Sequence, residues 1–119
     1  MPVQHLPTSQ AAVKTAQFGD VYVVTAEGEL DVSGAGPLRR ELDRVHERGG
    51  RRIIVDLLGV SFLDSAALGV LVGSAKRARA SGGRFSLVSD DPRALRVFQI
   101  TGLDRVFSLE RSLAAAIDL

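Results

Sequence analysis

Hydrophobic and polar positions along the chain change their period several times, and each change predicts a new element. From residue 12 to residue 30, apolar side chains alternate with polar ones, as in strands with one buried face. Gly19-Asp20 interrupts the alternation with residues that favour tight turns. This segment therefore predicts a β-hairpin.

A helical period follows the hairpin. Ser33 is a residue type that favours the N-cap, Pro37 would then fall in the tolerant first turn, and Gly49-Gly50 would stop the helix. The apolar stripe of this predicted helix has the spacing i, i+4, i+7 and consists of Leu38, Leu42 and Val45.

The middle of the chain predicts a buried strand and a second helix. Residues 53–60 form a dense β-branched run with one charge, which is typical of a central strand covered on both faces. A helix is predicted from Ser65 to about Ala80, and the spacing of Gly69 and Gly73 within it predicts close packing. Its predicted buried stripe comprises Leu68, Leu71, Val72 and Ala75.

The C-terminal third repeats the alternation of strand and helix. Residues 84–89 predict a strand, Asp91-Pro92 begins a helix that runs to about Thr101, and residues 106–109 predict a short strand. Ser112 can cap a final helix. The predicted order is β-β-α-β-α-β-α-β-α, which indicates an α/β fold with a mixed, mostly parallel sheet and about four helices.

Composition narrows the class of protein. We expect one domain over residues 10–119, preceded by a flexible arm at residues 1–9 with two prolines. A net charge of +1 argues against nucleic acid as a partner, and the absence of cysteine excludes thiolate chemistry. The N-terminus lacks the features of a signal peptide and no segment is long and apolar enough to span a membrane, so we expect a cytoplasmic protein without direct membrane insertion.

Candidate chemistry is sparse. Ser65 is the serine nucleophile worth testing, but it lacks the flanking glycines of a nucleophile elbow. His5 falls in the predicted arm and His46 on the charged side of the first helix, so both are expected on the solvated surface and neither as a base. No His and carboxylate spacing suits a metal. We therefore expect no enzyme activity, no metal and no cofactor.

Asp64-Ser65 is the most conspicuous polar pair, because it separates two apolar runs where a loop becomes a helix. Both residue types are favoured N-caps, so capping alone could account for the pair. Asp31, which ends the second predicted strand, is equally typical of a cap or turn. The residues alone therefore do not distinguish a structural role of Asp31, Asp64 and Ser65 from a functional one.

The sequence resembles the STAS family, in particular the bacterial anti-sigma factor antagonists. The resemblance rests on GELD at residues 28–31, IIVDLLGVSFLDSAALGVL at residues 53–71 and ITGLDRVFSL at residues 100–109. In that family a phosphorylatable serine begins the second helix, and Ser65 occupies this position. The family commonly has glycine where this chain has Ala67, which raises the question whether one methyl group hinders the close approach of a partner.

The resemblance implies a regulatory role by protein binding. The unphosphorylated chain would bind an anti-sigma factor that is also a serine kinase of the histidine-kinase-like ATPase fold, and so release a sigma factor. Phosphorylation of Ser65 would block binding, and a PP2C-type phosphatase would reverse it. The binding face implied by the family comprises Asp31, Ser33, Asp64, Ser65, Ala66 and Ala67. The alternative is a STAS subunit of a membrane lipid (ABC-type) transporter, which binds protein without needing phosphorylation.

Overall fold

The computed structural model describes residues 11–118. The chain folds as one α/β unit with the predicted order of strands and helices, plus a short 3-10 turn. The elements are β1 (Ala12–Phe18), β2 (Val21–Leu30), α1 (Val32–Glu47), β3 (Arg52–Leu63), α2 (Ser65–Ala80), β4 (Arg84–Val88), α3 (Pro92–Ile100), η1 (Leu103–Arg105), β5 (Ser108–Glu110) and α4 (Leu113–Ile117). The predicted arm at residues 1–9 lies outside the described residues.

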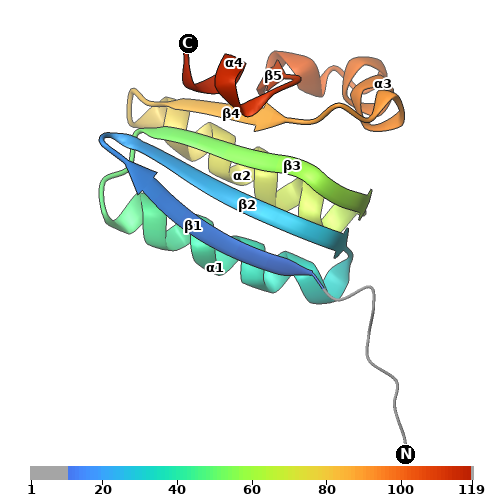
Figure 1. The fold of residues 1–119 in the computed structure, drawn as a ribbon, viewed down its shortest axis with the longest axis horizontal. Helices are drawn as coiled ribbons and strands as arrows, with labels where there is room; N and C mark the ends of the chain where they lie inside the picture. The colour runs from blue at the N-terminus through green and yellow to red at the C-terminus, as the bar shows by residue number, and fades with distance from the viewer. Residues whose placement is uncertain (1–10, 119) are drawn as a thin grey trace, which may run out of the picture.

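The five strands form one sheet in the order β1-β2-β3-β4-β5. β1 pairs antiparallel with β2 through the predicted turn at Gly19-Asp20, and the other neighbours are parallel. Helices α1 and α2 lie behind the sheet in Figure 1, and each returns the chain to the start of the next strand. The carboxyl ends of β2, β3 and β4 therefore share one edge, on the side of α3 in Figure 1.

Two hydrophobic clusters hold helices to opposite faces of the sheet. The larger joins alternate residues of β2, β3 and β4 to α1, α2 and α3, and includes the predicted stripe Leu38, Leu42 and Val45 of α1. The smaller packs Ala116 of α4 against the opposite face. Successive side chains of each strand point to opposite faces of the sheet, and so belong to different clusters.

The start of α1 differs from the prediction. The amide of Ala35 donates to the carbonyl of Asp31 at 3.0 Å, so the helix begins at Val32, and Ser33 lies inside its first turn rather than at the N-cap. Pro37 consequently lies in the second turn. The chain enters the helix directly from the end of β2, which leaves no loop residue between strand and cap.

Helix α2 has the predicted bounds, but the face that it buries differs from the predicted one. Leu71 and Ala75 are buried as expected, whereas Leu68 and Val72 are only partly buried. The buried face is completed by Ala67, Val70, Ser74 and Ala78, because α1 covers the adjoining side of the helix.

The predicted close packing at Gly69 and Gly73 is wrong. A Cβ atom built at either glycine would have no neighbour within 4 Å. Gly83, by contrast, lies against the backbone of Arg51, and a Cβ there would collide with the Arg51 carbonyl oxygen. Close backbone approach therefore occurs where α2 turns into β4 and not on the exposed face of α2.

Basic residues gather at the amino edge of the parallel strands. α1 and α2 end at this edge, where the helix dipole favours cations, and β3 and β4 begin there. The exposed basic residues of this region include Arg44, Arg48, Arg51, Lys76, Arg77, Arg79 and Arg84. None of the helices in the described part of the chain is long and apolar enough to cross a membrane.

Glycine substitutions test this packing. Gly83→Ala should lower the free energy of unfolding by about 1–3 kcal/mol, because the Arg51 backbone would have to move. Gly73→Ala, on the open face of α2, should raise it by about 1 kcal/mol through helix propensity. Urea unfolding followed by circular dichroism measures both, and equal effects in the two variants would contradict the packing.

Candidate functional site

The candidate site is built where β2 and β3 end together. Leu30 pairs with Leu63 in the parallel register, so the next residues of the two strands, Asp31 and Asp64, leave the sheet side by side. The amide of Asp64 donates to the carbonyl of Leu30 at 3.0 Å. Helices α1 and α2 both begin at this point, and the sequence-predicted residues at their starts are thereby brought together.

Asp64 is the N-cap of α2. Its Oδ1 accepts a hydrogen bond from the amide of Ala67 at 2.9 Å, and its carbonyl accepts one from the amide of Leu68 at 3.0 Å. The side-chain bond satisfies the Ala67 amide, which the first turn would otherwise leave without a partner, and the bond to Leu68 is the first regular hydrogen bond of the helix. The predicted cap is therefore formed, and the capping role falls to Asp64 rather than to Ser65.

Ser65 and Ala66 are exposed at the start of α2, whereas Ala67 is fully buried. Ser65 is the first residue of the helix and stands in solvent at the helix N-terminus. The methyl group of Ala67 packs in the core and does not stand on the surface that a partner would approach. Ala67 contributes to the site through its backbone amide.

Asp31 lies beside this cap at the end of β2 and is half-buried. Its carbonyl accepts the first hydrogen bond of α1, from Ala35. Ser33 follows in the first turn of α1, and its side chain is outside the described part of the structure. The main chain thus places Asp31 and Ser33 on the same edge of the sheet as Asp64 and Ser65.

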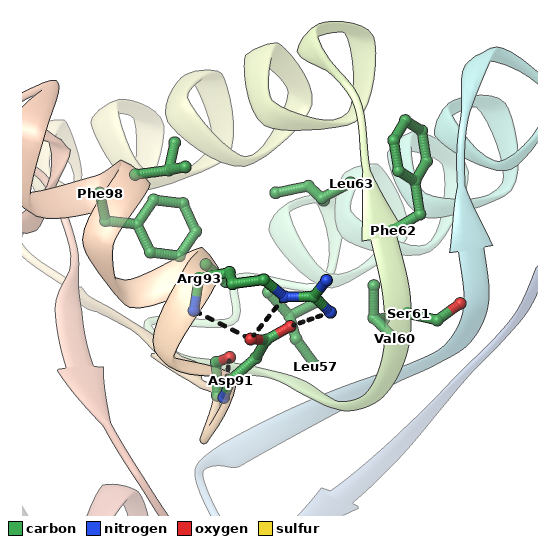
Figure 2. A pocket seen from close by; sticks show the side chains of 11 residues that line it. Leu57, Val60, Ser61, Phe62, Leu63, Asp91, Arg93 and Phe98 are labelled. Atoms are coloured by element: carbon green, nitrogen blue, oxygen red, sulfur yellow. Dashed lines mark hydrogen bonds and ion pairs between the residues drawn. The ribbon is translucent and has the colours of Figure 1, made fainter.

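An apolar groove, which the sequence analysis missed, adjoins this edge. It has a volume of about 260 Å³ and lies between the last residues of β3 and helix α3. Figure 2 shows Leu63 and Phe98 on opposite sides of the groove, with Arg93 extended into the space between α3 and β3. The groove is lined by Leu57, Val60, Ser61, Phe62, Leu63, Ser89, Asp91, Arg93, Ala94, Val97 and Phe98.

Asp91 supplies a charge at the groove and begins α3 as predicted. Its Oδ1 accepts from the amide of Arg93 at 2.9 Å, and the Arg93 guanidinium lies 3.5 Å from both carboxylate oxygens. The bond from the Arg93 amide, followed by the bond from its side chain, holds the pKa of Asp91 below its usual value. Asp91 therefore stays ionised at neutral pH.

His46 is only partly exposed, whereas the sequence predicted a solvated position. It is half-buried between α1 and α2, where its Nε2 lies 2.7 Å from the Ser74 hydroxyl oxygen. Burial, and then the positive charge of Arg77, lower the pKa of His46, and Asp43 only partly offsets them. The prediction failed because residues 28 positions apart in sequence meet here.

The His46–Ser74 pair is structural rather than nucleophilic. Ser74 is only 7% exposed, and it lies in the middle of α2, where backbone amides bond within the helix and cannot stabilise an oxyanion. Nor can His46 serve Ser65, since Ser65 and Ser74 are nine positions apart along α2, a rise of about 13 Å. Within residues 11–118, no group of three or more metal-ligating side chains is present.

Comparisons with known proteins agree on the fold and its class. Residues 12–116 match the family model of the STAS domain. The anti-sigma-B factor antagonist of Bacillus subtilis (strain 168) is 37% identical over 86 residues, which cover 72% of this chain and 78% of that protein. An anti-sigma factor antagonist from Mycobacterium paratuberculosis has a similar structure with a TM-score of 0.85, 27% identity and 97% of each chain covered. The Bacillus cell fate determinant SpoIIAA in its phosphorylated form has a TM-score of 0.73 and 27% identity, with 90% of this chain and 97% of that chain covered.

The cap of α2 can be tested by substitution at Asp64. Asp64→Ala should lower the free energy of unfolding by about 1 kcal/mol, because the Ala67 amide loses its acceptor. Asp64→Asn should retain most of the stability, since asparagine is an equally good N-cap. Thermal unfolding measures both, and an Asp64→Ala chain as stable as the wild type would show that the cap is not formed in solution.

Burial of His46 predicts a pH dependence of stability. With its folded-state pKa lowered, the unfolded chain binds more protons below about pH 6.5, so stability is present above that pH and falls as the solution becomes more acidic. The urea midpoint of the wild type should therefore fall more steeply between about pH 7.5 and pH 5.5 than that of His46→Gln. Parallel curves for the two chains would contradict the burial of His46.

Proposed function

The chain belongs to the STAS domain family, and we propose that it acts there as an anti-sigma factor antagonist that is switched by phosphorylation of Ser65. Proteins of this type are regulatory binding proteins, and the chain is accordingly not an enzyme. The observation that carries the proposal is the placement of an exposed serine as the first residue of α2, directly after the capping Asp64. A related protein of 27% identity is described in a phosphorylated form, which supports the same chemistry here.

The unphosphorylated chain binds an anti-sigma factor through the edge formed by Asp31, Ser33, Asp64, Ser65 and Ala66. The partner is a serine kinase of the histidine-kinase-like ATPase fold, and its capture releases a sigma factor. A PP2C-type phosphatase resets Ser65, and the exchange takes place in the cytoplasm. ATP and magnesium belong to the kinase, so this chain itself needs no cofactor.

The free domain tolerates the phosphate. A phosphoserine adds about −1.5 to −2 charges at neutral pH. At the first residue of α2 this charge meets the positive end of the helix dipole, which contributes at most about 2 kcal/mol in its favour. The neighbouring Asp64 carboxylate opposes it, but water screens both terms on the exposed surface. The backbone of the switch therefore stays in place in both states.

The complex does not tolerate the same phosphate. A partner that covers Ser65 removes the water that solvates the phosphate. The cations of such a partner neutralise the carboxylates of the unphosphorylated surface, so the charge of the added phosphate stays uncompensated. Desolvation and repulsion of this kind amount to several kcal/mol. Reversing a population from 1:99 to 99:1 needs about 5.5 kcal/mol, which is of the same order. Binding can thus be switched without a large conformational change.

The experiment combines binding with phosphorylation. The wild type and Ser65→Ala should both bind the anti-sigma factor kinase of the same organism, but with ATP only the wild type should gain a phosphate, located by peptide mass spectrometry. Ser65→Glu should bind at least about tenfold more weakly, a loss of about 1.4 kcal/mol or more. Ser108→Glu, which places the same charge on an exposed serine of β5, is the matched control and should bind normally.

Phosphorylation in the native host completes this test. We expect the phosphate on Ser65 to change with growth and stress, measured in protein isolated from the host. If Ser65 stays unmodified throughout while the chain copurifies with membrane transport components, the proposal fails and the transporter-subunit alternative replaces it. Normal binding by Ser65→Glu would also overturn the switch.

A further inference from the structure

Exposed hydrophobic side chains gather on one side of the switch. Among the described residues, large apolar side chains that stand in solvent are concentrated on the end of β3 and on α3. Phe62 is 50% exposed and Val97 is 49% exposed, and both line the apolar groove. Leu58 of β3 and Ile100 of α3 are also exposed. A concentration of this kind marks an interaction surface more often than scattered single residues do.

The groove is continuous with the switch. Leu63 forms part of its wall, and the next two residues are the capping Asp64 and the exposed Ser65. A protein that covers Ser65 with an interface of ordinary size, about 800 Å² on each side, extends well beyond a single side chain. The open groove is the adjoining surface that offers both depth and apolar area.

The charged residues around the groove indicate what kind of partner fits it. Segments 28–31, 61–65 and 89–93 surround the carboxyl edge of the sheet, and their only basic residue, Arg93, is already paired with Asp91. These segments carry five acidic residues against one basic residue, so their formal charge is negative and attracts cations on an incoming surface. The acidic residues of these segments are Glu29, Asp31, Asp64, Asp90 and Asp91.

We propose that the groove between β3 and α3 receives an aliphatic or aromatic anchor side chain of the anti-sigma factor, flanked on that protein by arginine or lysine. The inference rests on the proposed function, since it names a second contact of the same complex. Ser65 is the point at which the complex is switched, and the groove supplies much of its affinity. Buried apolar anchors that fill a partner's pocket commonly dominate such interfaces.

Substitutions at Val97 test the groove without disturbing the cap. Val97 lies on the exposed side of α3, so Val97→Asp and Val97→Arg should fold normally, which circular dichroism verifies. Both should weaken binding of the anti-sigma factor kinase by about tenfold or more, because a charge replaces apolar contact area. Val97→Arg should bind the partner more weakly than Val97→Asp, since the arginine also repels the flanking cations of the partner. Val97→Ile should bind like the wild type.

Phe18→Asp is the matched control, because Phe18 is 61% exposed but lies at the β1–β2 hairpin, at the opposite end of the sheet (Figure 1). Its Kd, measured by isothermal titration calorimetry, should equal that of the wild type. If Ser65→Glu weakens binding but Val97→Asp and Val97→Arg do not, the groove inference fails and the proposed function stands. An equal loss in Phe18→Asp would also overturn the groove. If the wild type binds no such kinase of its organism, the groove inference and the proposed function fail together.

Discussion

The parallel pairing of β2 with β3 determines where every element of the site lies. Because Leu30 and Leu63 are register partners at the ends of their strands, the two chains leave the sheet together and start α1 and α2 at one edge. The hydrogen bond from the Asp64 amide to the Leu30 carbonyl fixes this junction. A slip of one residue would move Asp64 away from its partner and turn the alternating side chains of β3 to the other face.

Asp64 caps α2 at this junction and also belongs to the proposed binding edge. The Asp64 carboxylate closes the first turn of α2, and its rigid position also holds the backbone of Ser65 on the surface. A helix that begins with a satisfied cap has little freedom to unwind when a charge is added beside it. This geometry fits the proposed switch, in which Ser65 would be presented with or without a phosphate on an unchanged scaffold.

Local signals allowed much of this structure to be predicted from the sequence. The β1–β2 turn, the bounds of α2, the Asp91 cap and the Ser112 cap depend on residues close in sequence, and the prediction of each is confirmed. The His46–Ser74 contact and the groove between β3 and α3 depend on how distant elements pack, and the sequence did not predict either. The extension of β3 to Leu63 was also missed, although the apolar run that continues beyond Val60 could have indicated it.

The separation of charge along the strands follows from the parallel topology. The N-termini of α1 and α2 meet at the acidic edge and their C-termini at the basic edge, so each set of side chains complements the helix ends beside it. Each helix end carries only about half a charge, and the ionised side chains therefore dominate the field outside the molecule. Such a molecule rotates in the field of a charged protein before the two surfaces touch, over distances of about 8 Å in physiological salt. The topology of the sheet would thus determine the direction from which the proposed cationic partner approaches.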